Sequence, residues 1–334
     1  MSRPASAEGR FDVVTMGRVG IDLYPATEGV PLAEVEQFTR YLGGSPTNVA
    51  VGTRRLGHRS AVITRTGDDP FAPFVRNELE QLGVSSRYVL AAEGARTTLA
   101  FCELFPPDRF PLYFVRDAPP PELAIAPDDL DLDVIADAGV FWSTLTGLSG
   151  EPSRGAHLAA WGSRRGGRNT VLDLDLRPSY WNTLDDARDA GLEALAYVDV
   201  VVGNIDECAV VLGDHDPARA ASALLDHGVR LAIVKRGPHG VLAATRERMV
   251  DVPAFPTRVV NGLGAGDAFG AGLCHGLLSG MDLDETIAFA SAAGAIVAAR
   301  HECARAMPAE DAVRAVLAGE EPHVVARSMT TGHS

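Results

Sequence analysis

The sequence predicts an α/β fold, in which a doubly wound, mostly parallel β-sheet is covered by helices on both faces and carries a small protruding sheet. Two observations lead to this prediction. From residue 130 onward, short and nearly continuous apolar runs alternate with amphipathic segments, as in parallel sheets buried on both faces. In the first 120 residues, strand-like segments are instead interrupted by Pro and Gly, which is typical of an exposed sheet.

The core elements follow in order along the chain. Core strands are expected at residues 11–16, 60–64, 140–142, 170–174, 198–202 and 231–234, and a further strand with its turn at 259–263. Helices are expected at residues 46–56, 71–82, 154–164, 185–196, 216–227 and 267–278. In such sheets ligands bind beyond the carboxyl ends of the strands, so we expect the functional site at that edge.

The interrupted segments 21–41 and 96–116 are expected to pair as the protruding sheet, which would form a lid over the strand ends. One domain is therefore expected over residues 11–320. Residues 1–10 and 321–334 lack apolar periodicity and are expected to be flexible tails.

The composition excludes several classes of protein. A formal charge of −14 argues against a nucleic-acid surface, which needs a basic patch, and favours a small-molecule substrate. No run approaches the roughly 18 apolar residues of a membrane span and the N-terminus has no signal-peptide core, so we expect a cytoplasmic protein without membrane contact. The four cysteines are too far apart for C-x-x-C motifs and are expected to be buried free thiols.

The most informative motif is Gly264-Ala265-Gly266-Asp267, which precedes an apolar-periodic helix. The N–H groups at a helix start are unpaired and lie at the positive end of the helix dipole, and glycines let them close around an anion. A carboxylate belongs in such a turn if it accepts the proton of a hydroxyl while the turn stabilises a transferring phosphoryl group. The motif therefore indicates a kinase acting on an alcohol, although a lone Asp267 is equally compatible with a simple helix cap.

Two further blocks lie upstream. In Gly43-Gly44-Ser45-Pro46-Thr47-Asn48, the paired glycines allow close backbone approach, and Pro46 favours a helix start that places Asn48 in the first turn, within reach of a ligand. An ordinary strand-to-helix turn is the alternative. Asp22, which follows the first strand, either binds two sugar hydroxyls or is a solvated turn residue.

Together these blocks and two others resemble the ribokinase-like (PfkB) family of carbohydrate kinases over about residues 11–318. The blocks occur in the family's order: Gly17 to Asp22, Gly43-Gly44 to Asn48, Asn204-Ile205-Asp206-Glu207, Gly237-Pro238-His239-Gly240 and Gly264 to Asp267. The resemblance implies a ribokinase-like three-layer α/β/α fold. It also implies that Asp267 is the catalytic base, that Gly264, Ala265 and Gly266 form the anion hole, and that Asp22, Gly43, Gly44 and Asn48 hold substrate hydroxyls.

The same resemblance implies ATP and Mg²⁺. Asn204 and Glu207 would organise Mg²⁺ through water together with the nucleotide phosphates, although a helix cap explains this pair equally well. Lys235, Gly237 and Gly240 would flank the nucleotide. Asn261-Gly262-Leu263 stands where many family members have Asp-Thr-Thr, so the resemblance leaves a monovalent-cation site near this loop undecided.

Arg116 and Arg177 bear on the choice of substrate. Guanidinium groups pair with carboxylates, so these arginines favour a sugar acid, with a surface position as the alternative for each. Within the family, residues 16–25, 42–50 and 262–270 are most similar to members that use ATP to phosphorylate the 6-hydroxyl of 5-dehydro-2-deoxy-D-gluconate in myo-inositol catabolism. Kinases of 2-dehydro-3-deoxygluconate, fructose or ribose are the alternatives within the family.

Two other classes of protein fit the sequence less well. A non-catalytic sugar or nucleotide sensor would share the fold, but Asp267, Asn204 and Glu207 together argue against it. A Rossmann dehydrogenase is disfavoured because Gly17-Arg18-Val19-Gly20 lacks the G-x-G-x-x-G spacing. An apolar lid sheet often pairs with that of a second copy, which predicts a homodimer through the lid.

Overall fold

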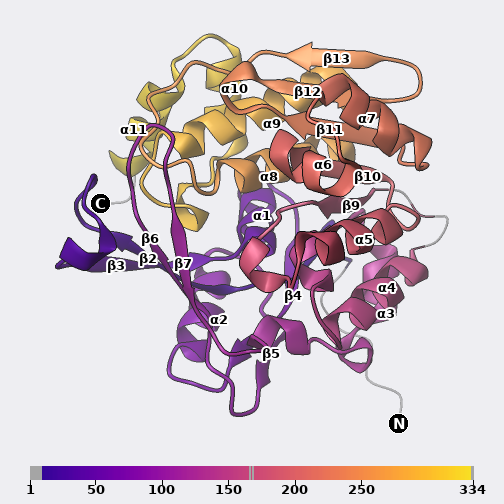
Figure 1. Cartoon of the computed structure of the whole chain (residues 1–334). Coiled ribbons are helices and arrows are strands. Elements are labelled where there is room, and N and C mark those ends of the chain that lie inside the picture. The colour runs from indigo at the N-terminus through magenta and orange to yellow at the C-terminus, as the bar shows by residue number, and fades with distance from the viewer. Residues whose placement is uncertain (1–9, 165–166, 168, 332–334) are drawn as a thin grey trace.

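The computed structural model describes residues 10–164, 167 and 169–331, and its centre is a nine-stranded sheet between two helical layers (Figure 1). Across the sheet the strands are β13 (Met249–Val252), β12 (Val241–Ala244), β11 (Leu231–Lys235), β10 (Val200–Asn204), β9 (Thr170–Asp173), β8 (Val140–Thr144), β1 (Val13–Met16), β4 (Ser60–Gly67) and β5 (Val89–Ala92). Every pairing from β5 to β11 is parallel, and only the β11–β12 and β12–β13 pairings are antiparallel. The predicted mostly parallel sheet is confirmed.

Helices cover both faces of the sheet. One layer contains α3 (Leu132–Asp137), α4 (Ser153–Ser163), α5 (Leu184–Ala194), α6 (Ile205–Leu212) and α7 (Pro217–Asp226). The other contains α1 (Ser45–Arg55), α2 (Ala72–Gln81), α8 (Ala265–Ser279), α9 (Leu283–Ala298), α10 (Glu310–Leu317) and α11 (Pro322–Thr331). Short 3-10 helices link these elements: η1 (Leu32–Glu34), η2 (Pro121–Ala124), η3 (Pro127–Asp129), η4 (Leu145–Leu148), η5 (Pro178–Tyr180), η6 (Gly237–His239) and η7 (Ala304–Ala306).

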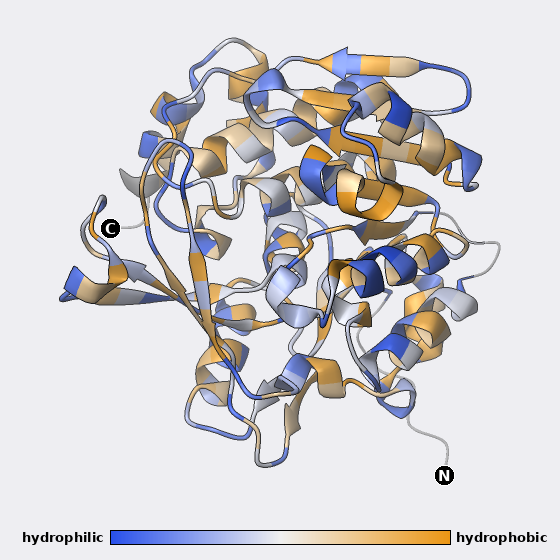
Figure 2. Ribbon diagram, viewed as in Figure 1, coloured by the Kyte–Doolittle hydropathy of each residue, from blue (hydrophilic) through white to orange (hydrophobic). Residues whose placement is uncertain are grey.

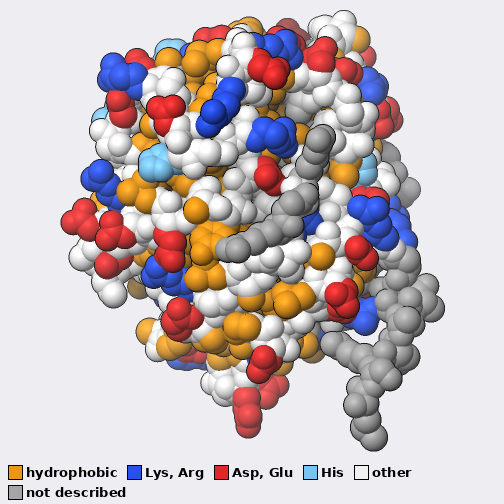
Figure 3. All heavy atoms as spheres, turned by 90° about the vertical axis from the view of Figure 1, so that its right-hand side faces the viewer, with side chains coloured by type: hydrophobic (Ala, Val, Ile, Leu, Met, Phe, Trp, Pro, Cys, Tyr) orange, Lys and Arg blue, Asp and Glu red, His pale blue; other side chains and the backbone are white. Residues whose placement is uncertain are grey.

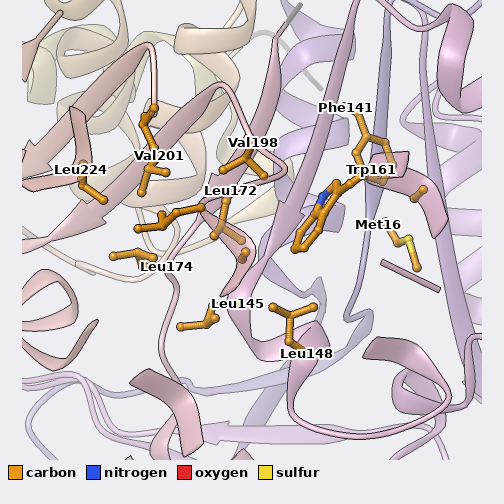
Figure 4. Packing of buried hydrophobic residues seen from close by; sticks show 14 of the residues in the cluster. Met16, Phe141, Leu145, Leu148, Trp161, Leu172, Leu174, Val198, Val201 and Leu224 are labelled. Carbon is orange, nitrogen blue, oxygen red and sulfur yellow. The ribbon is translucent and has the colours of Figure 1, made fainter. Parts of the chain in front are cut away.

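The strands are apolar on both sides because both sides are buried (Figure 2). In β8, Phe141 packs into the cluster beneath α3 to α7, whereas Trp142 packs against α1, α8 and α9. Figure 4 shows the first cluster, in which Trp161 of α4 lies among the side chains of the strands. This alternation explains why the predicted strands read as continuous apolar runs.

The predicted protruding sheet is also present. Its four strands are β3 (Phe38–Gly43), β2 (Gly20–Pro25), β6 (Leu99–Cys102) and β7 (Leu112–Val115), in that order, and it projects from one side of the main domain (Figure 1). Among its apolar side chains, Phe38, Tyr113 and Val115 are exposed.

Two expectations are wrong. Residues 259–263 form no strand, because the N–H groups of Val260 and Asn261 donate to the Ala298 carbonyl at the end of α9 rather than to a neighbouring strand. Within the expected C-terminal tail, residues 322–331 form α11, because Val325 and Ala326 are buried against the α9 and α10 layer. The remaining tail residues, 1–9 and 332–334, lie outside the described residues.

The surface and the cysteines agree with the composition. All four cysteines, Cys102, Cys208, Cys274 and Cys303, are buried and unpaired with one another. On the face shown in Figure 3, acidic and basic side chains are intermixed. None of the helices in the described part of the chain combines the length and the apolar character that a bilayer crossing requires.

His157 makes the stability of this fold depend on pH. The side chain is fully buried in α4, where its Nδ1 donates to the Ser153 carbonyl at 2.8 Å, and burial lowers its pKa to about 4. The unfolded chain takes up a proton at this side chain near pH 6.5, so the contribution of His157 to stability is complete above that pH and is lost as the pH falls toward 4. At pH 5 the loss should be about 2 kcal/mol.

The comparison of His157→Gln with the wild type tests this prediction. Urea unfolding at pH 7 and pH 5 should show a loss of stability that is about 2 kcal/mol smaller in the variant. His227→Gln, at an exposed position, should lose as much stability between pH 7 and pH 5 as the wild type does. Equal losses in wild type and His157→Gln would show that this imidazole does not stay neutral in the core.

Candidate active site

Polar side chains gather where the parallel strands end. Asp173, Asn204 and Lys235 are the last residues of β9, β10 and β11, and Arg18 follows β1 by two residues. Because these strands are parallel, their carboxyl ends lie along one edge of the sheet. The sheet thus brings together residues that are far apart in the sequence.

The Gly264 turn begins α8. Gly264 is the N-cap with φ 80°, a left-handed conformation that favours glycine, and a Cβ there would lie 2.8 Å from the Cys303 sulfur. The first helical hydrogen bond runs from the Ala268 N–H to the Gly264 carbonyl at 2.9 Å, so the N–H groups of residues 265–267 have no helical acceptor. The turn has the unpaired donors that an anion needs.

Asp267 is the third residue of α8 and not its cap, so the helix-cap alternative is wrong. Its Oδ2 accepts a hydrogen bond of 2.7 Å from Asn48 Nδ2 in the first turns of α1. Burial, and then the nearby Asp175 carboxylate, raise the pKa of Asp267, while the Asn48 bond opposes this shift. A carboxylate with a raised pKa is a better proton acceptor than a solvated one.

Asp22 lies in β2, buried against β3. A Cβ at Gly43 would lie 2.2 Å from the Asp22 carboxylate, and a Cβ at Gly44, where φ is 111°, would lie 2.3 Å from the Arg18 carbonyl oxygen. At both positions the neighbouring atoms leave no room for a Cβ, so glycine is required there. Asp22 Oδ2 accepts a bond of 3.2 Å from the Tyr24 hydroxyl, while its Oδ1 is buried without a partner.

Acidic groups surround Lys235. Its Nζ lies 3.7 Å from Asp173 Oδ1, and a Cβ at Gly266 would lie 3.4 Å from the same Nζ, so the ammonium borders the anion-binding turn. The pKa of Asp173 is raised to about 7, mainly by burial and also by the carboxylates of Asp175 and Glu207, against the lowering effect of Lys235. One lysine thus faces several acids, which leaves the site favourable for an additional cation.

Asn204 and Glu207 form a helix cap. Asn204 Oδ1 accepts from the Glu207 N–H at 2.9 Å, and Glu207 Oε2 accepts from the Asn204 N–H at 2.7 Å. In the described residues, no group of three His, Cys, Asp or Glu side chains is placed to bind a metal ion directly. The oxygens of the pair retain free lone pairs, and Mg²⁺ readily keeps its hydration shell, so the geometry is compatible with Mg²⁺ held through water.

The turn of residues 237–240 lies beside Lys235 at the edge of the sheet. Gly237 begins η6 with φ 56°, and Gly240 ends it with φ 82°. A Cβ at Gly240 would lie 2.1 Å from the Val252 carbonyl oxygen. These glycines let the connection between β11 and β12 turn tightly directly after Lys235 and Arg236.

The two arginines singled out from the sequence have partners. Arg177 Nη2 lies 2.6 Å from Asp175 Oδ1. Arg116 donates to the Ser179 carbonyl, and its Cζ lies 4.1 Å from the centre of the Tyr180 ring. Arg116, directly after β7, therefore joins this strand to η5, whereas the charges of Asp175 and Asp267 contribute to the raised pKa of Arg177.

Asn261 holds the loop that carries the anion-binding turn. It is fully buried, its Nδ2 donates to the His301 carbonyl at 2.9 Å, and its Oδ1 accepts from the Leu263 N–H at 3.0 Å. The departure from Asp-Thr-Thr thus introduces an amide that binds one backbone acceptor and one backbone donor. This amide connects the turn to the segment after α9.

Several charged residues near the predicted site were not predicted from the sequence. Arg18, Asp173 and Asp175 lie at the strand ends beside the predicted residues, and Glu122 is buried next to them with bonds from Tyr180 and Thr98. A charged residue at or just beyond the carboxyl end of an apolar strand was a signal for Asp173 and Arg18. No comparable signal marked Glu122, which reaches the site through tertiary packing.

Comparisons with known proteins agree with this geometry. A family model described as pfkB family carbohydrate kinase matches residues 10–310. The chain is 31% identical over 329 residues to the 5-dehydro-2-deoxygluconokinase of Clostridium perfringens, an alignment that covers 96% of this chain and 97% of the relative.

Solved structures share the fold. The fructokinase of Vibrio cholerae O395, in its fructose, ADP and calcium ion bound form, has a TM-score of 0.81 at 24% identity and covers 91% of this chain and 98% of its own. An uncharacterized sugar kinase of Pyrococcus horikoshii in complex with ATP has a TM-score of 0.76 at 26% identity, covering 94% of this chain and 99% of its own. These neighbours confirm the predicted three-layer fold.

The contact of Gly43 with Asp22 can be tested through stability. Gly43→Ala should destabilise the protein by about 1–3 kcal/mol, because its Cβ cannot fit beside the Asp22 carboxylate without a shift of one strand. Gly162→Ala is the matched control, since a Cβ there meets no atom within 4 Å and α4 gains a better helix former. Urea unfolding measures both, and a Gly43→Ala protein as stable as Gly162→Ala would contradict the described packing.

Proposed function

Because this chain belongs to the pfkB family of carbohydrate kinases, we propose that it transfers the γ-phosphoryl group of ATP to the 6-hydroxyl of 5-dehydro-2-deoxy-D-gluconate, in the catabolism of myo-inositol. One observation carries the proposal: the Asp267 carboxylate, hydrogen-bonded to Asn48, lies in the same turn as the unpaired N–H groups of α8. The name of the relative at 31% identity supports the choice of substrate.

In the proposed reaction Asp267 is the base. It accepts the proton of the 6-hydroxyl as that oxygen attacks the γ-phosphorus, the bond from the γ-phosphorus to the bridging oxygen breaks, and ADP leaves. The N–H groups of Gly264, Ala265 and Gly266 would stabilise the charge on the transferring group. Asn48 keeps Asp267 oriented, and Asp22 with the Gly43-Gly44 backbone would bind other substrate hydroxyls.

We place the nucleotide along Lys235 and the turn from Gly237 to Gly240. Asn204 and Glu207 would hold Mg²⁺ through water, and the bound ion would neutralise part of the charge on the phosphates. The acids around Lys235 support this assignment, since they already repel one another in the described site.

Arg177 and Arg116 support an acidic substrate. Each contacts a residue of the segment after β9: Arg177 pairs with Asp175, and Arg116, which follows lid strand β7, bonds the Ser179 carbonyl. A sugar acid bound under the lid would meet this positive charge. The exposed apolar side chains of the lid support a homodimer through that sheet, which light scattering on the purified protein would test.

A substrate panel tests the proposed function. ADP release should be measured with 5-dehydro-2-deoxy-D-gluconate, 2-dehydro-3-deoxy-D-gluconate, fructose and ribose. The first should have a kcat/KM at least about 10-fold above the others, and NMR of the product should show the phosphate at C6. A higher kcat/KM for another member of the panel would overturn the proposed substrate.

Replacing the base tests the mechanism. Asp267→Asn should lower kcat by on the order of 10²-fold or more, because the amide cannot accept the proton. ATP binding, measured by calorimetry, should stay within about twofold. Asp185→Asn, on the exposed first turn of α5, should retain the wild-type kcat. Unchanged turnover in Asp267→Asn would remove this carboxylate from the mechanism.

A further inference from the structure

Arg18 is a partly buried arginine whose guanidinium has no hydrogen-bond partner. Among the described residues no hydrogen bond or ion pair of its side chain is found, and its Nη1 is buried without an acceptor. The guanidinium carbon lies 5.2 Å from the centre of the Phe114 ring on lid strand β7. A buried donor without an acceptor is costly, so a ligand that supplies one would be bound favourably.

The acidic neighbours of Arg18 favour its charged form but accept no hydrogen bond from its guanidinium group. Burial lowers the pKa of Arg18, but Tyr180, Asp22 and Glu122 outweigh burial and raise it. Glu122 already accepts bonds from the Tyr180 hydroxyl at 2.6 Å and from Thr98 at 3.1 Å. Asp22 Oδ1 is itself without a partner, so polar atoms of two residues here are left for a ligand.

Arg18 differs in this respect from the other arginines of the site. Arg177 is paired with Asp175 at 2.6 Å, and Arg116 bonds the Ser179 carbonyl. Their donors are at least partly used in holding the segment after β9. Of these three arginines, Arg18 is the one whose guanidinium donors have no hydrogen-bond partner among the described residues.

Hydrogen bonds at the start of α1 place Arg18 near Asp267. The Arg18 carbonyl accepts a bond of 3.1 Å from the Thr47 hydroxyl, and the next residue, Asn48, donates to Asp267 Oδ2 at 2.7 Å. The Arg18 guanidinium extends from this point to the Phe114 ring on β7. A six-carbon acid bound with its terminal hydroxyl at Asp267 would therefore have the Arg18 guanidinium as a partner for its carboxylate.

We infer that Arg18 binds the carboxylate of the substrate and selects a sugar acid over a neutral sugar. The inference rests on the proposed function and assigns the recognition of the acid to a residue outside the predicted set. The planar guanidinium offers two parallel N–H donors to the carboxylate, Phe114 holds its plane, and the unpartnered Asp22 Oδ1 is left for a substrate hydroxyl. Arg18 is thus a specificity residue, distinct from the base.

The test compares two substrates in four proteins: the wild type, Arg18→Gln, Arg18→Lys and Arg87→Gln. The substrates are 5-dehydro-2-deoxy-D-gluconate and its reduced analogue, in which a hydroxymethyl group replaces the carboxylate. In Arg18→Gln, kcat/KM for the acid should fall about 100-fold, mainly through KM, while kcat/KM for the analogue changes less than about threefold. Arg87→Gln, on the ring of Tyr88 outside the site, should retain the wild-type preference.

A purely structural role of Arg18, in balancing Asp22 and Glu122, would lower kcat/KM equally for both substrates and would overturn the inference. Arg18→Lys keeps the charge and serves as a second variant in case Arg18→Gln does not fold. Its kcat/KM for the acid should fall about 10-fold, because the ammonium lacks the paired donors. An unchanged preference in folded Arg18→Lys and Arg18→Gln overturns the inference alone. A wild-type enzyme that prefers the neutral analogue overturns the proposed substrate as well.

Discussion

The hydrogen bond between Asn48 and Asp267 requires the starts of two helices, 219 residues apart in the sequence, to lie against each other. α1 and α8 approach this closely because glycines line their contact. A Cβ at Gly52 of α1 would lie 2.5 Å from the Ala271 Cβ, and a Cβ at Gly270 of α8 would lie 3.2 Å from Val49 Cγ2. The packing of α1 against α8 therefore determines where the Asp267 carboxylate is held, because the distance between Asn48 and Asp267 is set by the positions of the two helices.

The buried charges of the site reduce the stability of the folded chain. Asp173, Asp22 and Glu122 are buried, and burial raises the pKa of each. Buried acids that raise one another's pKa values destabilise a protein unless cations or donors compensate them. Here Lys235 and Arg18 compensate them in part, and Asp22 Oδ1 and Arg18 Nη1 are buried without hydrogen-bond partners among the described residues. A site of this kind gains stability from the ligands that it binds.

The predicted fold rested on patterns that packing confirms. The runs at 140–142 and 170–174 are continuous because β8 and β9 are buried on both faces, and the interrupted segments form the lid because only part of that sheet is covered. The strand expected at 259–263 is absent, since its N–H groups bond the end of α9, a partner that no local pattern reveals. α11 was missed because two buried residues are too few for a visible period.

The sequence alone determined the local chemistry of two motifs. Gly264 to Asp267 was predicted as an anion-binding helix start that contains an acid, because the N–H groups of a helix start are unpaired. Gly43-Gly44 was predicted as a close backbone approach, because glycine has no Cβ and is conformationally free. Only the tertiary structure decided which groups share the site. It joins Asn48 to Asp267, surrounds Lys235 with acids, and leaves Arg18 free while Arg116 and Arg177 are occupied. The physical reason is that hydrogen bonds and charge interactions act over a few ångströms in space, and distances between residues far apart in the chain are set by the packing of the whole fold.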